Sequence, residues 1–435
     1  MRAPSPRTQR LAAVLSGAFL LAGFTASGGP APTFTSAARC WVDGKAEDAL
    51  AALGLAPQAR ERELNGAVVR LYSGEAEEAV AALDALHRRE ARWAPALRWL
   101  ARAQEELGQP EALDSAAALL GMPGADVRDR LWAGRLFLKQ GDLPRARAAF
   151  LRAVGDNDGL ELGWAGLAEA EAQLGNAEAA RAASARSAAL RGGELAPLSP
   201  GLRPGERLRY RAKYLFLTLA SVTFETGEPI VYAGRSAHKL VFSAKSNDSI
   251  PFFRMDSRFE SVVAQDGAVL AHRHVASDSD TGSDEAVYDM DREGLRCTVR
   301  TVRDGLFGYE VLPLPANAQD GVSVLLVARA VARARGSAVV PTAVDSLWWP
   351  TQLRTVGIES IRWQGHEVQT VRVQAVGHYR GPGGLSGAVD IWVSDDERAV
   401  PYRVRMKVAV GSVTLELLPD EATVLASAPV EGVSR

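Results

Sequence analysis

Four glycines recur at a nearly constant interval in the first half of this 435-residue chain. Gly74, Gly108, Gly141 and Gly175 are 34, 33 and 34 residues apart, and each lies where one stretch of helical periodicity gives way to the next. A glycine at such a place readily takes the left-handed conformation that ends a helix. The interval therefore predicts repeated pairs of antiparallel helices over about residues 60–193.

Small and large residues recur at fixed distances from these glycines. Small residues let two helices approach closely, and large ones fill the groove between neighbouring pairs. This pattern resembles the tetratricopeptide repeat family. The resemblance implies a curved scaffold that binds a peptide or protein on its concave face, and the alternative is an array that only packs against its neighbouring domain. The clearest unit, Arg130–Gly159, carries Gly134, Phe137, Gly141, Ala146, Phe150 and Ala153 at these positions.

The pattern changes near residue 195. After Pro200 apolar and polar residues alternate, and Val, Thr and Tyr become common, which is typical of β-strands. The expected fold class is α+β multidomain, a tetratricopeptide-like α-solenoid followed by a large antiparallel β-sheet or open β-barrel. Strands are expected at Arg207–Tyr214, near Ala237–Ser243, Ser257–Ala264, Leu295–Val302, Gln369–Val376 and Ala388–Val393, and around 402–408, with one helix at Val322–Ala334.

The second half also carries several short sequence blocks, Pro204–Tyr210, Asp256–Ser261, Asp320–Arg329, Ile391–Arg398, Val400–Pro401 and Gly411–Val413. Together these blocks resemble a known family, the exported bacterial domain of unknown function 3108. The resemblance covers about residues 202–418 and departs at Ser346–Pro350. Because that family has no established activity, it implies a compartment and a fold only. Residues Trp392–Val404 are also similar to periplasmic lipoprotein carriers, which cradle acyl chains in a half-barrel.

The N-terminus has the pattern of an export signal. Three arginines within residues 1–10 precede an apolar run of 14 residues, Leu11–Phe24, which contains one polar residue. The run is shorter than the roughly 20 residues that span a membrane. We therefore expect an exported chain, periplasmic or associated with the envelope of a Gram-negative bacterium, and no transmembrane span after cleavage. The expected ranges are a signal peptide and leader at 1–38, repeats at 46–193, a linker at 194–201, the β domain at 202–418 and a tail at 419–435.

The charge balance limits the class of partner. The 50 Lys and Arg residues face 52 Asp and Glu residues, so the formal net charge is −2. Binding of nucleic acid through bulk electrostatics is therefore not expected. The local pattern is different, because two strands carry basic residues on one side and apolar residues on the other.

These two strands supply the candidate ligand-binding residues. If they are neighbours, their cations share one face and can hold the phosphate or carboxylate groups of envelope lipids; solvent exposure alone explains the same alternation. The opposite face either lines a lipid-sized cavity or is filled core. The basic candidates are Arg209, Arg211, Lys213, Arg403, Arg405 and Lys407, and the candidates of the opposite face are Tyr210, Tyr214, Trp392 and Met406.

No catalytic or metal-binding residue is predicted. Asp395, Asp396 and Glu397 lie between two strands, where a hairpin needs polar turn residues. His272 and His274 are two residues apart, so on a strand both face the same side and can bind one metal ion together. A third ligand is missing from the local sequence. We expect no cofactor.

The chain has two cysteines, Cys40 and Cys297, which can form one cross-link in an oxidising compartment or remain free. The alternation around Cys297 favours a buried, inward-facing thiol. Taken together, the sequence predicts a non-enzymatic envelope protein whose repeats dock a protein partner and whose β domain binds an apolar or amphipathic ligand, such as a lipid or lipoprotein. The alternatives are an envelope hydrolase that uses carboxylates of the sheet loops, and a purely structural assembly factor.

Overall fold

The structure, a computed structural model, describes residues 34–53, 59–191, 202–215, 217–249, 255–278, 282–377, 388–407 and 411–419. The predicted linker, residues 1–33 of the predicted signal peptide and leader, and all but one residue of the predicted tail lie outside these ranges. Among the helices of the described ranges, none is both long and apolar enough to cross a membrane.

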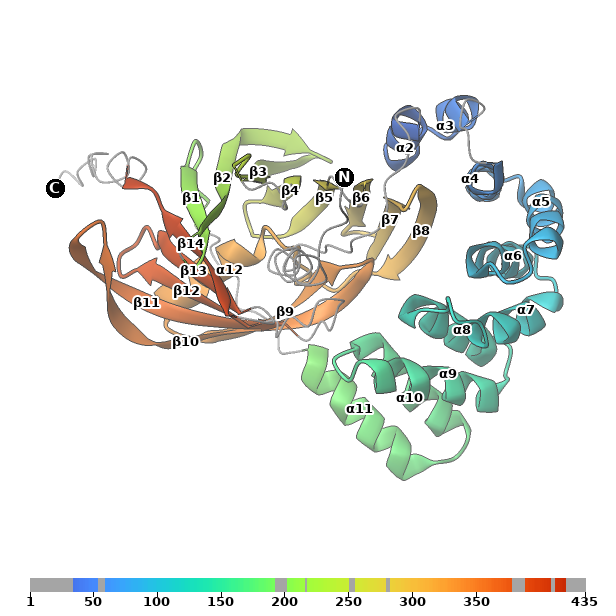
Figure 1. Cartoon of the computed structure of the whole chain (residues 1–435). Helices are drawn as coiled ribbons and strands as arrows, with labels where there is room; N and C mark the ends of the chain where they lie inside the picture. The colour runs from blue at the N-terminus through green and yellow to red at the C-terminus, as the bar shows by residue number, and fades with distance from the viewer. Residues whose placement is uncertain are drawn as a thin grey trace.

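The first half of the described chain consists of helices that pack as consecutive antiparallel pairs (Figure 1). The four periodic glycines lie two residues after the ends of α4, α6, α8 and α10, with φ between +65° and +89°. A Cβ atom at any of them would meet no atom within 4 Å, so glycine is required there by the backbone angle and not by lack of space. The helices are α2 (Phe34–Val42), α3 (Ala46–Leu53), α4 (Ala59–Tyr72), α5 (Ala76–Arg89), α6 (Ala94–Glu106), α7 (Glu111–Leu120), α8 (Val127–Lys139), α9 (Leu143–Asp156), α10 (Glu161–Gln173) and α11 (Ala177–Arg191).

The predicted small and large positions meet inside the array. A Cβ on Gly134 of α8 would lie 2.8 Å from the ring of Phe150 on α9, and a Cβ on Gly166 of α10 would lie 2.4 Å from the same ring. Phe150 is 1% exposed. One aromatic ring therefore fills the space that two glycines leave on the helices before and after it, and this confirms the repeat packing expected from the sequence.

The second half is an open antiparallel sheet of 14 strands in the described chain, in the order β8-β7-β6-β5-β4-β3-β2-β1-β14-β13-β12-β11-β10-β9. The predicted fold class is confirmed, and the strand predicted at Arg207–Tyr214 is β1. The other strands are β2 (Leu217–Tyr232), β3 (Arg235–Ser246), β4 (Met255–Ala264), β5 (Val269–Asp278), β6 (Gly282–Asp291), β7 (Arg296–Arg303), β8 (Leu306–Pro313), β9 (Ser337–Val344), β10 (Leu347–Trp363), β11 (His366–Gly377), β12 (Ala388–Ser394), β13 (Pro401–Lys407) and β14 (Ser412–Leu417).

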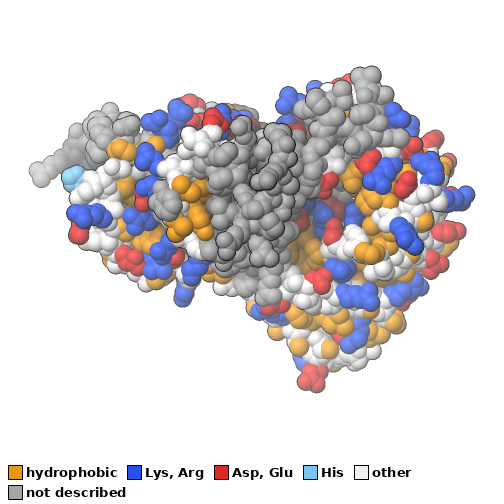
Figure 2. Space-filling model, in the orientation of Figure 1, with side chains coloured by type: hydrophobic (Ala, Val, Ile, Leu, Met, Phe, Trp, Pro, Cys, Tyr) orange, Lys and Arg blue, Asp and Glu red, His pale blue; other side chains and the backbone are white. Residues whose placement is uncertain are grey.

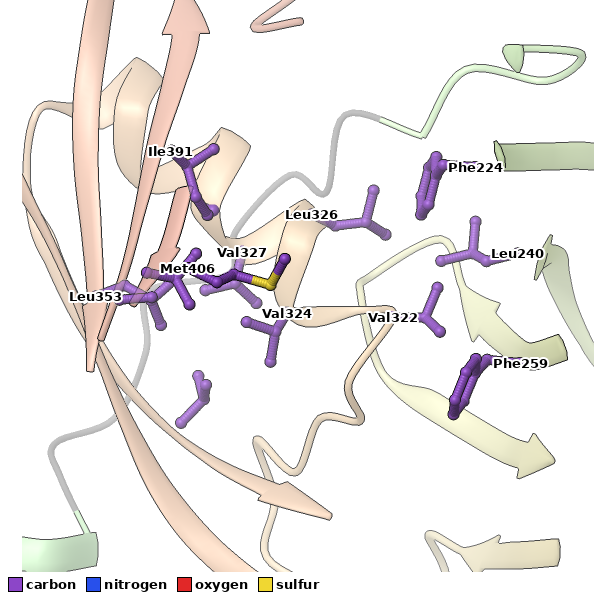
Figure 3. Close-up of a cluster of buried hydrophobic side chains, with 14 of the residues drawn as sticks. Phe224, Leu240, Phe259, Val322, Val324, Leu326, Val327, Leu353, Ile391 and Met406 are labelled. Carbon is purple, nitrogen blue, oxygen red and sulfur yellow. The ribbon is translucent and has the colours of Figure 1, made fainter. Parts of the chain in front are cut away.

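The sheet curves around the helix α12 (Val324–Ala334), the one predicted at Val322–Ala334 (Figure 1). Val322 and Val324, at the start of this helix, lie between Phe224 and Phe259 on one arm of the sheet and Met406 on the other (Figure 3). Apolar side chains from both arms and from the helix form one continuous core. The curved sheet is thus a half-barrel whose inside is partly filled by the helix.

The helical array forms an arc whose inner side faces β7 and β8 (Figure 1). Its core is continuous with strand residues, because Phe307 of β8 and Trp349 of β10 belong to the same buried cluster as the helix residues. Charged side chains of both signs intermix over the outer surface of the array (Figure 2). The two halves of the described chain are therefore packed against each other through apolar side chains.

Candidate apolar pocket and outer basic face

A pocket opens on the inside of the half-barrel, between the start of α12 and the curved sheet. Its volume is about 900 Å³, including the space open to solvent. Aromatic rings from three neighbouring strands line one side, and aliphatic side chains from β12, β13 and β14 line the other. The principal lining residues are Phe224, Phe242, Phe259, Ile391, Val404 and Met406 (Figure 3 labels four of them).

Strand register builds the aromatic side of the pocket. Phe224 of β2 lies directly opposite Phe242 of β3, which lies directly opposite Phe259 of β4. Side chains directly opposite each other on adjacent antiparallel strands share one face of the sheet. The sequence alone does not predict this row, because each phenylalanine lies in a separate strand and only the strand pairing aligns them.

Among the described residues, the lining has polar side chains only at Thr342 and Thr351. The hydroxyl of Thr342 donates to that of Thr351 at 2.8 Å, and both residues are 3% exposed. One hydrogen bond thus joins the two hydroxyls across β9 and β10, and the described lining offers a ligand no charged group. A site of this composition favours hydrocarbon over a polar small molecule.

The four residues predicted for the inner face, Tyr210, Tyr214, Trp392 and Met406, take different positions in the structure. Met406 lines the pocket, but Tyr210 and Tyr214 do not. Tyr210 is buried, and its hydroxyl donates to the carbonyl of Pro401 at 2.9 Å. Burial raises the pKa of Tyr210 well above its usual range, so the hydroxyl stays neutral. Both tyrosines are core residues on the inner face.

Trp392 does not lie on the inner face, and this corrects the sequence prediction. It lies directly opposite Arg403 of β13 and Arg372 of β11, on the outer face. Its indole N–H donates to Glu359 at 2.9 Å, and the guanidinium of Arg405 lies 4.9 Å from its ring centre. Because β12 is buried on both faces, the apolar character of Trp392 did not reveal which side it takes.

The six predicted cations share the outer face, but their strands are not neighbours. β14 lies between β1 and β13, so that Arg211, Glu416 and Arg403 form one row across the three strands. Lys213 pairs with Glu416 at 2.7 Å, and Arg405 pairs with Asp390 at 3.2 Å. On the described parts of β1, β14, β13 and β12, this face carries seven basic residues and these two acids. Its net charge is therefore strongly positive.

The acidic residues after β12 form a turn, as predicted. Asp396 accepts hydrogen bonds from the backbone N–H groups of Arg398 and Ala399 at 3.0 Å and from the hydroxyl of Ser394 at 2.7 Å. Burial acts to raise the pKa of Asp396, but these bonds outweigh it and hold the pKa below its usual value. Asp395 pairs at 2.7 Å with Arg335, the residue directly after α12. These contacts give both carboxylates structural roles.

His272 and His274 point into the sheet interior from β5. The Nδ1 atom of His272 lies 3.0 Å from the hydroxyl of Ser261 and 3.6 Å from the carboxylate of Asp320. Burial lowers the pKa of both histidines, and most strongly that of His274. No three His, Cys, Asp or Glu side chains of the described ranges come together as a candidate metal site.

Both cysteines are free thiols. Cys297 lies on β7 and is fully buried, which confirms the predicted inward orientation, and burial raises its pKa to about 12. Cys40 lies on α2 and is half-buried.

Comparison with known proteins follows the same division of the chain. Residues 209–418 match the model of DUF3108, described as a protein of unknown function. The match includes the lining residues of the pocket named above, every one of which lies between Phe224 and Met406. No curated protein matches the chain.

Solved helical-repeat structures are similar to the N-terminal half. A MamA protein is 14% identical, with a TM-score of 0.33, and the match covers 36% of this chain and 89% of that one. MamA from Desulfovibrio magneticus RS-1 is 17% identical, with a TM-score of 0.33 and coverage of 36% and 92%. A tetratricopeptide repeat protein from Parabacteroides merdae ATCC 43184 is 17% identical, with a TM-score of 0.31 and coverage of 36% and 66%.

Proposed function

We propose that this protein is an exported, non-enzymatic envelope protein that binds the hydrocarbon part of a lipid or lipoprotein in the half-barrel pocket and engages a protein partner through its helical repeats. The observation that carries the ligand assignment is the composition of the pocket: its two hydroxyls bond to each other, and the remaining lining side chains are apolar. The export assignment is supported by the basic and apolar segments of residues 1–24.

The geometry favours a ligand that is apolar along its length. A hydrocarbon chain gains about 0.8 kcal/mol for each methylene group that it buries. A ligand with buried hydrogen-bonding groups would leave them unpaired in this pocket, at a cost of roughly 1–3 kcal/mol for each group. An acyl chain whose polar end stays at the solvent-facing opening fits both conditions.

Native mass spectrometry of the protein purified from its own envelope tests the ligand assignment. We expect lipid to copurify with the wild-type chain and to be depleted in Leu325→Trp, where a larger side chain enters the pocket from the half-buried face of α12. The matched control is Ile358→Trp on β10, a 55% exposed aliphatic residue outside the pocket lining. Absence of lipid from both proteins, together with a stable protein partner, would instead support an assembly factor.

The outer basic face supports a second, separable proposal: attachment to anionic headgroups. Arg211 and Lys407 are exposed there, and the two acids of the face pair with Lys213 and Arg405. The phosphate groups of an anionic membrane surface would balance the remaining positive charge of this face. Because this face is opposite the pocket, the headgroup held here belongs to a surrounding bilayer and not to the bound ligand.

A further inference from the structure

The inner side of the helical arc, for which the sequence predicts either a protein partner or the neighbouring domain, is in contact with the chain's own β7–β8 hairpin. Asn65 of α4 is fully buried and makes two hydrogen bonds to the backbone of that hairpin. Its side-chain nitrogen donates to the carbonyl of Gly305 at 2.8 Å, and its side-chain oxygen accepts from the N–H of Phe307 at 2.9 Å. Both bonded groups belong to the backbone where the turn at residues 304–305 ends and β8 begins, and Gly305 of that turn has a φ of +73°.

Aromatic stacking adds selectivity beside Asn65. The ring of Trp41 stacks on Phe307, with centroids 5.4 Å apart and an interplanar angle of 9°, and Tyr72 stacks on Tyr309 at 3.8 Å. Phe307 is 1% exposed. Two rings of the helical array therefore hold two rings of the hairpin that are separated by one residue, Gly308.

A cation completes the set of contacts. Arg102 of α6 is 7% exposed, pairs with Glu310 at 2.7 Å and donates to the carbonyl of Tyr309 at 3.2 Å. The guanidinium of Arg102 also lies 5.1 Å from the ring centre of Trp99. The array thus recognises a short extended segment, Phe307-Gly308-Tyr309-Glu310, by backbone, two aromatic rings and one acid.

The hairpin is not sealed into the array. β8 is at the end of the sheet order and pairs with β7 alone among the strands of the described chain. A second pocket, of about 890 Å³ including the space open to solvent, lies beside it and is lined by Arg98 and Arg128 of the helices and by Tyr309 and Glu310 of the hairpin. Tyr72 is 38% exposed. An edge strand beside an open pocket can be exchanged at lower cost than a central strand.

We propose that the inner side of the helical arc is a peptide-binding groove that the β7–β8 hairpin occupies, and that a protein partner engages the array by presenting an extended segment with an aromatic, small, aromatic, acidic sequence, which displaces the hairpin. This inference rests on the proposed docking role of the repeats and is independent of the pocket ligand. Because the hairpin is covalently attached, its high effective concentration keeps the groove closed to weak competitors.

A labelled peptide with the sequence of residues 305–312 tests the proposal on the full chain. We expect weak binding to the wild type and binding at least tenfold tighter to Phe307→Ala/Tyr309→Ala, in which the hairpin has lost both rings. Adding Asn65→Ala to that double variant should return the affinity to the wild-type level, because the groove has lost its backbone contacts. A peptide with alanine in place of both aromatic residues should bind at least tenfold more weakly than the parent peptide.

Two results would overturn the proposal. One is equal affinity of the peptide for the wild type and the double variant, or no binding to either. The other is equal binding of the parent and alanine-substituted peptides. The parent and alanine-substituted peptides are compared on one protein, the Phe307→Ala/Tyr309→Ala variant. That comparison therefore still tests the proposal if Asn65→Ala destabilises the fold. Lipid bound to the same preparations is measured separately, so that failure of the groove and failure of the pocket are distinguished.

Discussion

The guanidinium of Arg329 on α12 and the carboxylate of Glu206, one residue before β1, form a two-point ion pair at 2.5 and 3.0 Å. Both side chains are 1% exposed. Arg329 also donates to the carbonyl of Arg398 at 2.8 Å. This contact fixes the helix inside the half-barrel and thereby sets the position of Val322 and Val324 in the pocket lining.

Breaking this pair from one side should destabilise the protein strongly. Arg329→Met leaves the carboxylate of Glu206 buried without its partner, and we expect a loss of about 3–5 kcal/mol of unfolding free energy. Urea denaturation measures it. Arg88→Met, which removes a pair with Asp84 from a side chain that is 77% exposed, is the control and should change the unfolding free energy by less than about 0.5 kcal/mol. Equal effects of the two substitutions would refute the role of the buried pair.

Acid should destabilise the sheet through His274. Burial, together with the nearby His272 and Arg303, lowers the pKa of His274 well below its ordinary value in the folded chain. The unfolded chain therefore takes up the proton first, near pH 6.5, and stability is lost as the pH falls below that value, by up to about 1.4 kcal/mol per pH unit. In urea titrations at pH 7.5 and 5.5, His274→Gln should lose less stability than the wild type. Parallel losses would show that His274 does not contribute.

Alanine substitution of a crowded and of an uncrowded glycine should change the stability of the repeats in opposite directions. Gly166→Ala places a Cβ 2.4 Å from the ring of Phe150, and we expect a loss of about 1–3 kcal/mol. Gly155→Ala, on α9, meets no atom within 4 Å and should stabilise the protein by about 0.5–1 kcal/mol. Thermal unfolding followed by circular dichroism measures both changes. A shift of the same sign for both would contradict the packing of Phe150 described above.

Removal of three cations from the outer basic face should weaken attachment to anionic vesicles. We expect Arg211→Gln/Arg405→Gln/Lys407→Gln to lose about 1 kcal/mol of binding free energy for each residue in cosedimentation with phosphatidylglycerol vesicles at low salt. Arg88→Gln/Arg89→Gln/Lys139→Gln, on the helical array, changes the net charge equally and is the control. The proposal fails if both triple variants bind equally.

Helix ends, strand β1 and the turn at Asp396 could be predicted from the sequence, because each depends on interactions between residues close together in the chain. The glycine interval located the ends of four helices, and the alternation in Arg207–Tyr214 matched β1 residue for residue. The turn at Asp396 followed from the same logic, because its acceptors bond to N–H groups two and three residues away. Each of these signals is contained within a single turn, strand or helix pair.

The candidate pocket was only partly predictable. Met406 was identified, because alternation separates the two faces of β13, but alternation cannot tell which strands are adjacent. The row of Phe224, Phe242 and Phe259, the intervening strand β14 and the outward orientation of Trp392 all depend on pairing between distant segments. Strand order and register, which decide these features, are not encoded in the alternation pattern of a single strand.

The sequence by itself determined where helices and strands form and which residues of each have small, large, apolar or basic character, since these follow from periodicity and backbone preference. Only the tertiary structure decided what each face meets. Asn65 bonds to Gly305, 240 residues away, and the inner side of the arc is filled by a hairpin of the same chain. The physical reason is that a local pattern shows that a face will be buried, whereas its occupant is selected by the packing of the whole chain.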